Sequence, residues 1–147
     1  MDNQVIGKVL AIAIRSSEGG PMREITQAAI PDAGGIEGDL PSSPNRALTL
    51  LAAGQWRQIN AELGTDLPWH TRRANVLIDC DSLVHLIGKT IAIGQVRLEV
   101  LKETRPCELM DRQHDGLRRA LEPECRGGVH GRILQTGRFC VGDVVAL

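Results

Sequence analysis

Short runs of aliphatic residues separated by glycine dominate the hydrophobic pattern of this chain. The first run, residues 5–14, is rich in β-branched and aliphatic types and ends at a Ser-Ser-Glu-Gly-Gly cluster, which predicts a strand followed by a turn. Similar patterns predict further strands at residues 23–30, 46–51, 74–79, 90–93, 96–102, 131–135 and 143–147. Short strands at this spacing indicate a mainly β protein, built as a predominantly antiparallel barrel or sandwich.

One segment of the chain has the periodicity of a helix. In residues 53–63, Trp56, Ile59 and Leu63 fall on one face, and Gly64 supplies a C-terminal stop. A second helix is expected near residues 116–121. The stretch from Pro31 to Pro44 contains prolines and glycines with little periodicity, which predicts a surface loop. We therefore expect a β-barrel with the helix at 53–63 packed outside it.

Composition and charge restrict the function classes. The 147 residues are 42% hydrophobic, enough for one core, which indicates a single domain. A net charge of −1 argues against nucleic acid or an anionic membrane as partner. No apolar run approaches the roughly 18 residues of a membrane span, and the first residues, Met1-Asp2-Asn3-Gln4, lack the features of a secretory signal. We expect a cytoplasmic protein.

The cysteines are scattered, and one of them has an unusual setting. Without a Cys-x-x-Cys pair, and in a reducing compartment, all four are expected to be free thiols. Cys107 directly follows Arg105 and Pro106, just past the strand predicted at 96–102. Proline makes the approach rigid, and a neighbouring guanidinium favours the thiolate, the form that attacks sulfur or binds a soft metal. The alternative is a buried cysteine that acts as a small hydrophobe.

Arginine makes up most of the basic residues, 14 against 3 lysines. Genomic base composition can produce this bias; the alternative is a site for bidentate recognition of oxyanions. Four stretches at predicted strand edges combine arginine with glycine or other permissive residues: Gly38-Asp39 with Asn45-Arg46, Arg72-Arg73-Ala74-Asn75, Arg105-Pro106-Cys107 and Arg126-Gly127-Gly128-Val129. Gathered at one barrel mouth, they would form an arginine-lined pocket with Cys107 at one wall. A single arginine, taken alone, is more typical of a solvated surface.

Several short motifs occur in an order that carries a family resemblance: Arg46-Ala47-Leu48-Thr49-Leu50, Arg72-Arg73-Ala74-Asn75-Val76, Pro106-Cys107, Arg126-Gly127-Gly128-Val129-His130-Gly131 and Val141-Gly142-Asp143. Together they resemble a MOSC domain, the module named for the C-terminal part of molybdenum cofactor sulfurases. Each motif is short, and the specificity lies in their order and spacing. The resemblance implies a mainly β, MOSC-type barrel related to the pyruvate-kinase β-barrel, with a few peripheral helices, as one domain over residues 1–147.

The resemblance also implies a cofactor and a site. Cys107 falls on the family's characteristic cysteine, which would be a sulfur carrier or a ligand of molybdenum, and both uses suit a thiolate. The molybdenum cofactor, molybdopterin, would be held by Arg46, Arg72, Arg73, Asn75, Arg105, Arg126, Gly127 and Gly128. The sequence contains no desulfurase domain with a pyridoxal-phosphate lysine, and it lacks the additional N-terminal barrel of the amidoxime-reducing relatives.

Three functional hypotheses follow from this resemblance. The first is a protein that binds molybdenum cofactor or carries sulfur through Cys107 in an arginine-lined pocket. The second is a molybdenum-dependent reductase of N-hydroxylated substrates, which requires an external electron donor. The third is a non-catalytic module that delivers cofactor or sulfur. The expected partners are a pterin cofactor or small anionic ligand, and a sulfur-donor or redox protein.

Overall fold

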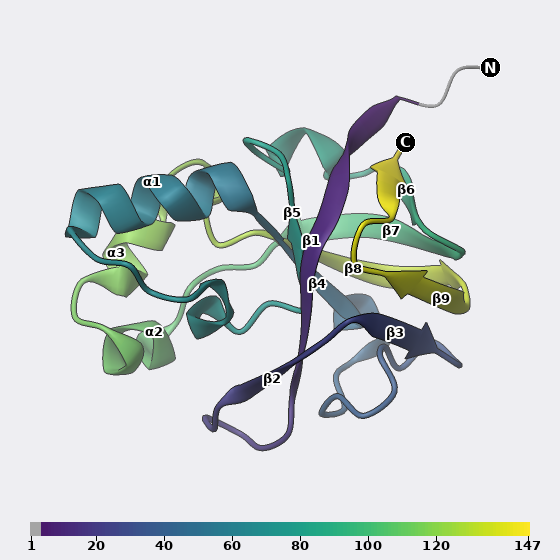
Figure 1. Ribbon diagram of the computed structural model, residues 1–147, viewed down its shortest axis with the longest axis horizontal. Helices are drawn as coiled ribbons and strands as arrows, with labels where there is room; N and C mark the ends of the chain where they lie inside the picture. The colour runs from purple at the N-terminus through teal and green to yellow at the C-terminus, as the bar shows by residue number, and fades with distance from the viewer. Residues whose placement is uncertain (1–3) are drawn as a thin grey trace.

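Seven strands of this protein close into a β-barrel, as expected from the glycine-punctuated strands (Figure 1). The computed structural model describes residues 4–147; residues 1–3, which belong to the segment used above against a secretory signal, lie outside the described residues. The strands follow the order β1-β5-β4-β8-β7-β6-β10, and β10 pairs again with β1. Their bounds are β1 Val5–Arg15, β4 Leu48–Ala52, β5 Val76–Ile78, β6 Thr90–Ile93, β7 Val96–Glu103, β8 Val129–Gln135 and β10 Val144–Ala146.

All neighbouring barrel strands are antiparallel except β4 and β5, which run parallel. The long strand β1 closes the barrel because its start pairs with β10 and its middle with β5. Its end continues beyond the barrel and pairs with β2 (Met22–Ile25). A separate two-stranded sheet is formed by β3 (Gln27–Ile30) and β9 (Gly137–Cys140).

Two apolar clusters hold the fold together. The first fills the barrel and contains inward-pointing residues of every barrel strand, such as Ile12, Leu50 and Leu98. The second lies between the outer wall and the helices, where Leu51 and Trp56 are among its members. The helices α1 (Ala53–Leu63), α2 (Glu108–Gln113) and α3 (Leu117–Leu121) all lie on the same side of the barrel in Figure 1. Strand alternation explains the division, since successive side chains of β4 point to opposite sides of the wall.

The sequence pattern located most elements but not all of them. The mainly β class and the helix at 53–63, which begins after Ala52 and ends at the left-handed Gly64, are confirmed. The segment 23–30 is two strands instead of one, because β2 pairs with β1 whereas β3 pairs with β9. The short elements β9 and α2 were not predicted, since four or six residues show too little periodicity. Within residues 4–147, no helix is long and apolar enough to cross a membrane.

Candidate functional site

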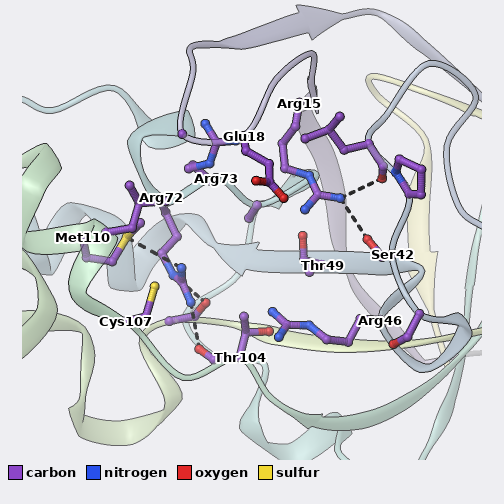
Figure 2. A pocket seen from close by; sticks show the side chains of 17 residues that line it. Arg15, Glu18, Ser42, Arg46, Thr49, Arg72, Arg73, Thr104, Cys107 and Met110 are labelled. Atoms are coloured by element: carbon purple, nitrogen blue, oxygen red, sulfur yellow. Dashed lines mark hydrogen bonds between the residues drawn. The ribbon is translucent and has the colours of Figure 1, made fainter.

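A cavity of about 560 Å³ lies against the outer wall of the barrel. Its lining includes three of the arginines predicted above, together with Cys107. Its lining residues include Arg15, Glu18, Ser42, Arg46, Thr49, Arg72, Arg73, Thr104, Cys107, Met110 and Gly127 (Figure 2). Thr49 stands between Leu48 and Leu50, whose side chains fill the barrel, so Thr49 points outward. The cavity is therefore not at the barrel mouth, where it was expected, but on the outside of the wall.

Arg72 forms the floor of the cavity and is the most buried charge in its lining. Only 6% of the residue is exposed. Its Nε donates to the carbonyl of Gly127 at 3.0 Å and its Nη2 to the carbonyl of Thr104 at 2.9 Å, while Nη1 lies 3.7 Å from the Met110 sulfur. These bonds tie together three segments that are far apart in the sequence. Among the described residues, no carboxylate forms a salt bridge with this guanidinium.

The electrostatic surroundings of Arg72 favour an anion beside it. Burial lowers the pKa of the Arg72 guanidinium to about 10, attraction to the Cys107 sulfur raises this pKa, and repulsion from Arg46 lowers it. A group with a pKa of about 10 is still charged at neutral pH. A buried charge without a counter-charge is costly, so negative charge in this cavity would be stabilised.

Cys107 is an exposed cysteine in the wall of the cavity. It precedes α2 with an extended backbone, φ −121° and ψ −177°, directly after Pro106. Its carbonyl accepts a hydrogen bond from the amide of Met110 at 3.0 Å. Figure 2 shows the sulfur next to the Arg72 side chain. The guanidinium that faces this thiol is therefore that of Arg72, and not that of the adjacent Arg105 as the local sequence suggested.

Three further arginines surround the cavity in different states. Arg15 is fixed by Asp39 through two bonds of 3.2 Å and by the Ser42 hydroxyl at 2.9 Å. Arg73 has a left-handed backbone, φ 67°, and its pKa is lowered by burial, with repulsion from Arg15 adding to this and attraction to Asp39 opposing it. Arg46 is exposed and belongs to none of the salt bridges found among the described residues. Arg46 is thus free to bind an incoming anion.

The structure gathers some of the predicted site residues and separates others. Arg46, Arg72, Arg73, Cys107 and Gly127 line the cavity, whereas the other four predicted residues, Asn75, Arg105, Arg126 and Gly128, do not.

The four residues outside the lining have physical reasons for their positions. Asn75 is buried beneath the lining and accepts hydrogen bonds from the amide and hydroxyl of Thr49 at 3.1 and 3.0 Å. The Arg105 side chain is 87% exposed. Arg126 is buried and binds both carboxylate oxygens of Glu62 at 2.9 Å. Gly128 has a left-handed φ of 91° and packs against the backbone of β4, so its role is conformational.

Several lining residues were not selected from the sequence, among them Arg15, Glu18 and Thr104. Arg15 ends the first strand, and its partner Asp39 stood in the Gly38-Asp39 pair, so a weak signal existed. Thr104 is buried beneath the cavity, with its hydroxyl 3.0 Å from Nδ1 of His130. Burial lowers the pKa of His130, and repulsion from Arg46 and Lys102 lowers it further. Threonine is a common residue, so the sequence alone could not predict the contact between Thr104 and His130.

The fold and the cavity define a class: a small β-barrel protein with an exposed cysteine and an arginine cluster on the outer wall. The model of the MOSC domain matches residues 37–146, about three quarters of the sequence. The chain belongs to the MOSC domain family, which is associated with molybdenum cofactor binding and with sulfur-related functions.

Solved structures agree with this assignment at the level of the fold. The YuaD protein from Bacillus subtilis is 17% identical with a TM-score of 0.82, covering 95% of this chain and 94% of that one. YiiM from Escherichia coli is 13% identical with a TM-score of 0.74, covering 95% of this chain and 69% of that one. At such identities the likeness establishes the fold alone. The comparison with curated proteins gives no match.

Proposed function

We propose that this protein binds molybdenum cofactor in the outer-wall cavity, with Cys107 as the ligand of the metal and the arginines as the binding site for the phosphate. The observation that carries the proposal is the juxtaposition of an exposed thiol with a buried guanidinium that has no carboxylate partner among residues 4–147. The family's association with this cofactor supports the choice of ligand.

The residues of the cavity fit such a cofactor in chemistry and in size. A volume of about 560 Å³ is within the range of about 300–1,000 Å³ that is usual for small-molecule sites. A thiolate is a suitable ligand for a soft metal centre. The exposed Arg46 would bind the phosphate, since a guanidinium matches phosphate oxygens in pairs. Both Nη atoms of the half-buried Arg73 already donate to the carbonyls of Ser17 and Gly20, so Arg73 would contribute its positive charge to the attraction. The cofactor would supply the redox chemistry when bound.

Arg72 has a separate role in this proposal. Two of its nitrogens already bind the carbonyls of Thr104 and Gly127, so it is fixed before any ligand arrives. A fixed positive charge next to Cys107 stabilises negative charge on sulfur without reorganisation. Arg72 would therefore offset the negative charge of a ligand held at Cys107.

Sulfur carriage through Cys107 is the second candidate function, and the exposure of this thiol favours it. A donor persulfide could reach the sulfur directly: the Cys107 thiolate attacks the outer sulfur of the donor, a new sulfur–sulfur bond forms on Cys107, and the donor leaves as a thiolate. This transfer needs a donor protein but neither an oxidant nor a reductant. Exchange with a cofactor or a partner enzyme would then complete the delivery.

Reconstitution tests the leading proposal. The purified protein is mixed anaerobically with molybdenum cofactor released from a donor molybdoenzyme and separated from free cofactor by gel filtration. Molybdenum is measured by mass spectrometry, and the pterin by the fluorescence of its oxidised form. We expect near-stoichiometric amounts of both in the wild type, loss of molybdenum in Cys107→Ser, and retention in Cys140→Ser, which changes a half-buried cysteine outside the cavity.

Two arginine variants form a matched pair in the same assay. Arg46→Ala removes an exposed arginine that lines the cavity, whereas Arg105→Ala removes an exposed arginine that does not. Loss of a hydrogen bond to a charged group costs about 1.5–3 kcal/mol, so Arg46→Ala should weaken cofactor binding about tenfold or more while Arg105→Ala leaves it unchanged. Equal retention by Cys107→Ser and wild type would refute the proposed ligand, and equal effects of the two arginine variants would refute the proposed phosphate site.

A further inference from the structure

Among residues 4–147, Glu18 is the single carboxylate that lines this arginine-rich cavity. It lies in the turn that joins β1 to β2. The amide of Gly20 donates to the carbonyl of Ser17 at 3.3 Å, which closes the turn, and Gly19 has the left-handed φ of 68° that such a position requires. Figure 2 shows the Glu18 side chain directed from this turn into the space bordered by Arg73 and Arg15.

The turn that carries Glu18 is held in place by the cavity itself. The guanidinium of Arg73 donates to the carbonyl of Ser17 at 3.1 Å and to the carbonyl of Gly20, on either side of Glu18. Both Nη atoms of Arg73 are therefore already bonded to the backbone of the turn. An exposed glutamate in a turn would otherwise sample many directions, and this anchorage keeps the Glu18 backbone at the rim.

The Glu18 carboxylate forms none of the salt bridges or side-chain hydrogen bonds found within residues 4–147. Its neighbours are already occupied: Arg15 by Asp39, and Arg73 by the turn. An unpaired carboxylate repels a purely anionic ligand and so weakens its binding to the surrounding arginines. The lining is therefore suited to a ligand that carries two features: an anionic group that binds the arginines, and N–H donors that bind the Glu18 carboxylate.

We propose that Glu18 is a specificity-determining residue that selects ligands with a 2-amino-4-oxopyrimidine edge, the edge that a pterin presents. This inference rests on the proposed function and adds the recognition of the ring. An ionised carboxylate only accepts hydrogen bonds and can accept two side by side. The pterin edge offers two adjacent donors, the N3–H and the exocyclic 2-amino group, and therefore matches it. A lumazine, which carries an oxygen in place of the 2-amino group, offers one donor and one acceptor.

A pair of probes that differ at the 2-position, and consequently in the proton on N1, tests the inference. Pterin-6-carboxylate and lumazine-6-carboxylate are titrated separately into the protein without cofactor, at slightly acidic pH so that N3 keeps its proton, and binding is followed by their fluorescence. We expect the wild type to bind the pterin about tenfold or more tightly than the lumazine, which corresponds to about 1.4 kcal/mol. Both probes carry the same carboxylate, so its attraction to the arginines contributes equally to both dissociation constants and does not affect their ratio.

Glu18→Gln gives the decisive comparison. A glutamine offers one acceptor and one donor, which suits the lumazine edge, so the preference should fall to about one or reverse. Loss of the negative charge alone would strengthen binding of both probes without changing their ratio. Glu37→Gln, an exposed glutamate outside the cavity lining, is the matched control and should keep the wild-type ratio.

The outcomes separate this inference from the proposed function. Equal binding of both rings by the wild type, or an unchanged ratio in Glu18→Gln, overturns the role of Glu18 while leaving a pterin site intact. A protein that binds neither ring but still retains molybdenum cofactor after gel filtration overturns the inference alone. A protein that retains neither the rings nor the cofactor overturns the proposed function as well.

Discussion

Limited alkylation should modify Cys107 before the other three cysteines. The perturbation is a substoichiometric amount of iodoacetamide near neutral pH, acting on native protein without cofactor. Cys107 is exposed, whereas Cys80, Cys125 and Cys140 are partly buried. Iodoacetamide reacts with the thiolate, so the order of labelling depends on both access and ionisation.

The expected difference can be worked out for Cys80. Burial, above all, raises the pKa of this thiol from 9.0 to about 11, although a hydrogen bond from the backbone of Ser82 opposes the shift. Two pKa units reduce the thiolate fraction about 100-fold. A more basic thiolate is also a better nucleophile, and a Brønsted slope of about 0.4–0.5 recovers roughly tenfold of the rate. Cys80 should therefore react about tenfold more slowly than in the unfolded chain, before any steric protection.

Cys125 should be slowed for a related reason. Burial raises its pKa, and the carboxylate of Glu103 raises it further by repulsion and by a hydrogen bond. Cys107 is exposed, and its sulfur is next to the fixed charge of Arg72. The first alkylated peptide should thus contain Cys107, ahead of Cys80 and Cys125.

The assay is a time course followed by digestion and mass-spectrometric peptide mapping. The same reaction in denaturant provides the reference rate for each cysteine, and Cys107→Ser should leave the slow labelling of Cys80 unchanged. Bound molybdenum cofactor or a persulfide should block the fast phase. Equal rates for all four cysteines, or a protected Cys107 in protein free of metal and added sulfur, would refute the reasoning and make this residue part of the packing.

The remaining predictions concern stability and are measured by denaturant unfolding. Arg126→Ala should lower the unfolding free energy by about 1–2 kcal/mol, because it removes a buried side chain that bonds to Glu62 and to the carbonyl of Ala120. An unchanged unfolding midpoint would mean that these contacts do not stabilise the fold. The pKa of His130 is lowered in the native state, so below the ordinary pKa of 6.5 the unfolded chain binds more protons at this residue than the folded chain does. The unfolding free energy therefore falls as the pH drops through 6.5, and His130→Gln should make its dependence on pH flatter in this range. Gly128→Ala should destabilise the fold by well over about 1 kcal/mol, because φ is 91° and a Cβ would overlap the backbone of β4; a native-like midpoint would contradict that geometry.

The sequence alone determined the class of the fold and the identity of most strands. Alternating and aliphatic runs set which side of each strand is buried, and glycines set where strands end. The helix at 53–63 was predictable because its apolar spacing and its glycine stop are both local. The position of Cys107 directly after a strand and a proline was also predictable, because Pro106 and the strand before it act within a few residues.

Only the tertiary structure decided which arginines share the cavity. Arg72 and Arg126 look alike in sequence, each beside a permissive residue, but Arg72 faces the cavity while Arg126 is bound to Glu62 of α1. The choice depends on contacts between segments more than fifty residues apart, and no local pattern records them. The same holds for Glu18, whose turn in the lining is bound by Arg73, a residue 56 positions away from Ser17. Propensity acts over a few residues, whereas the position of a charge is set by the packing of the whole barrel.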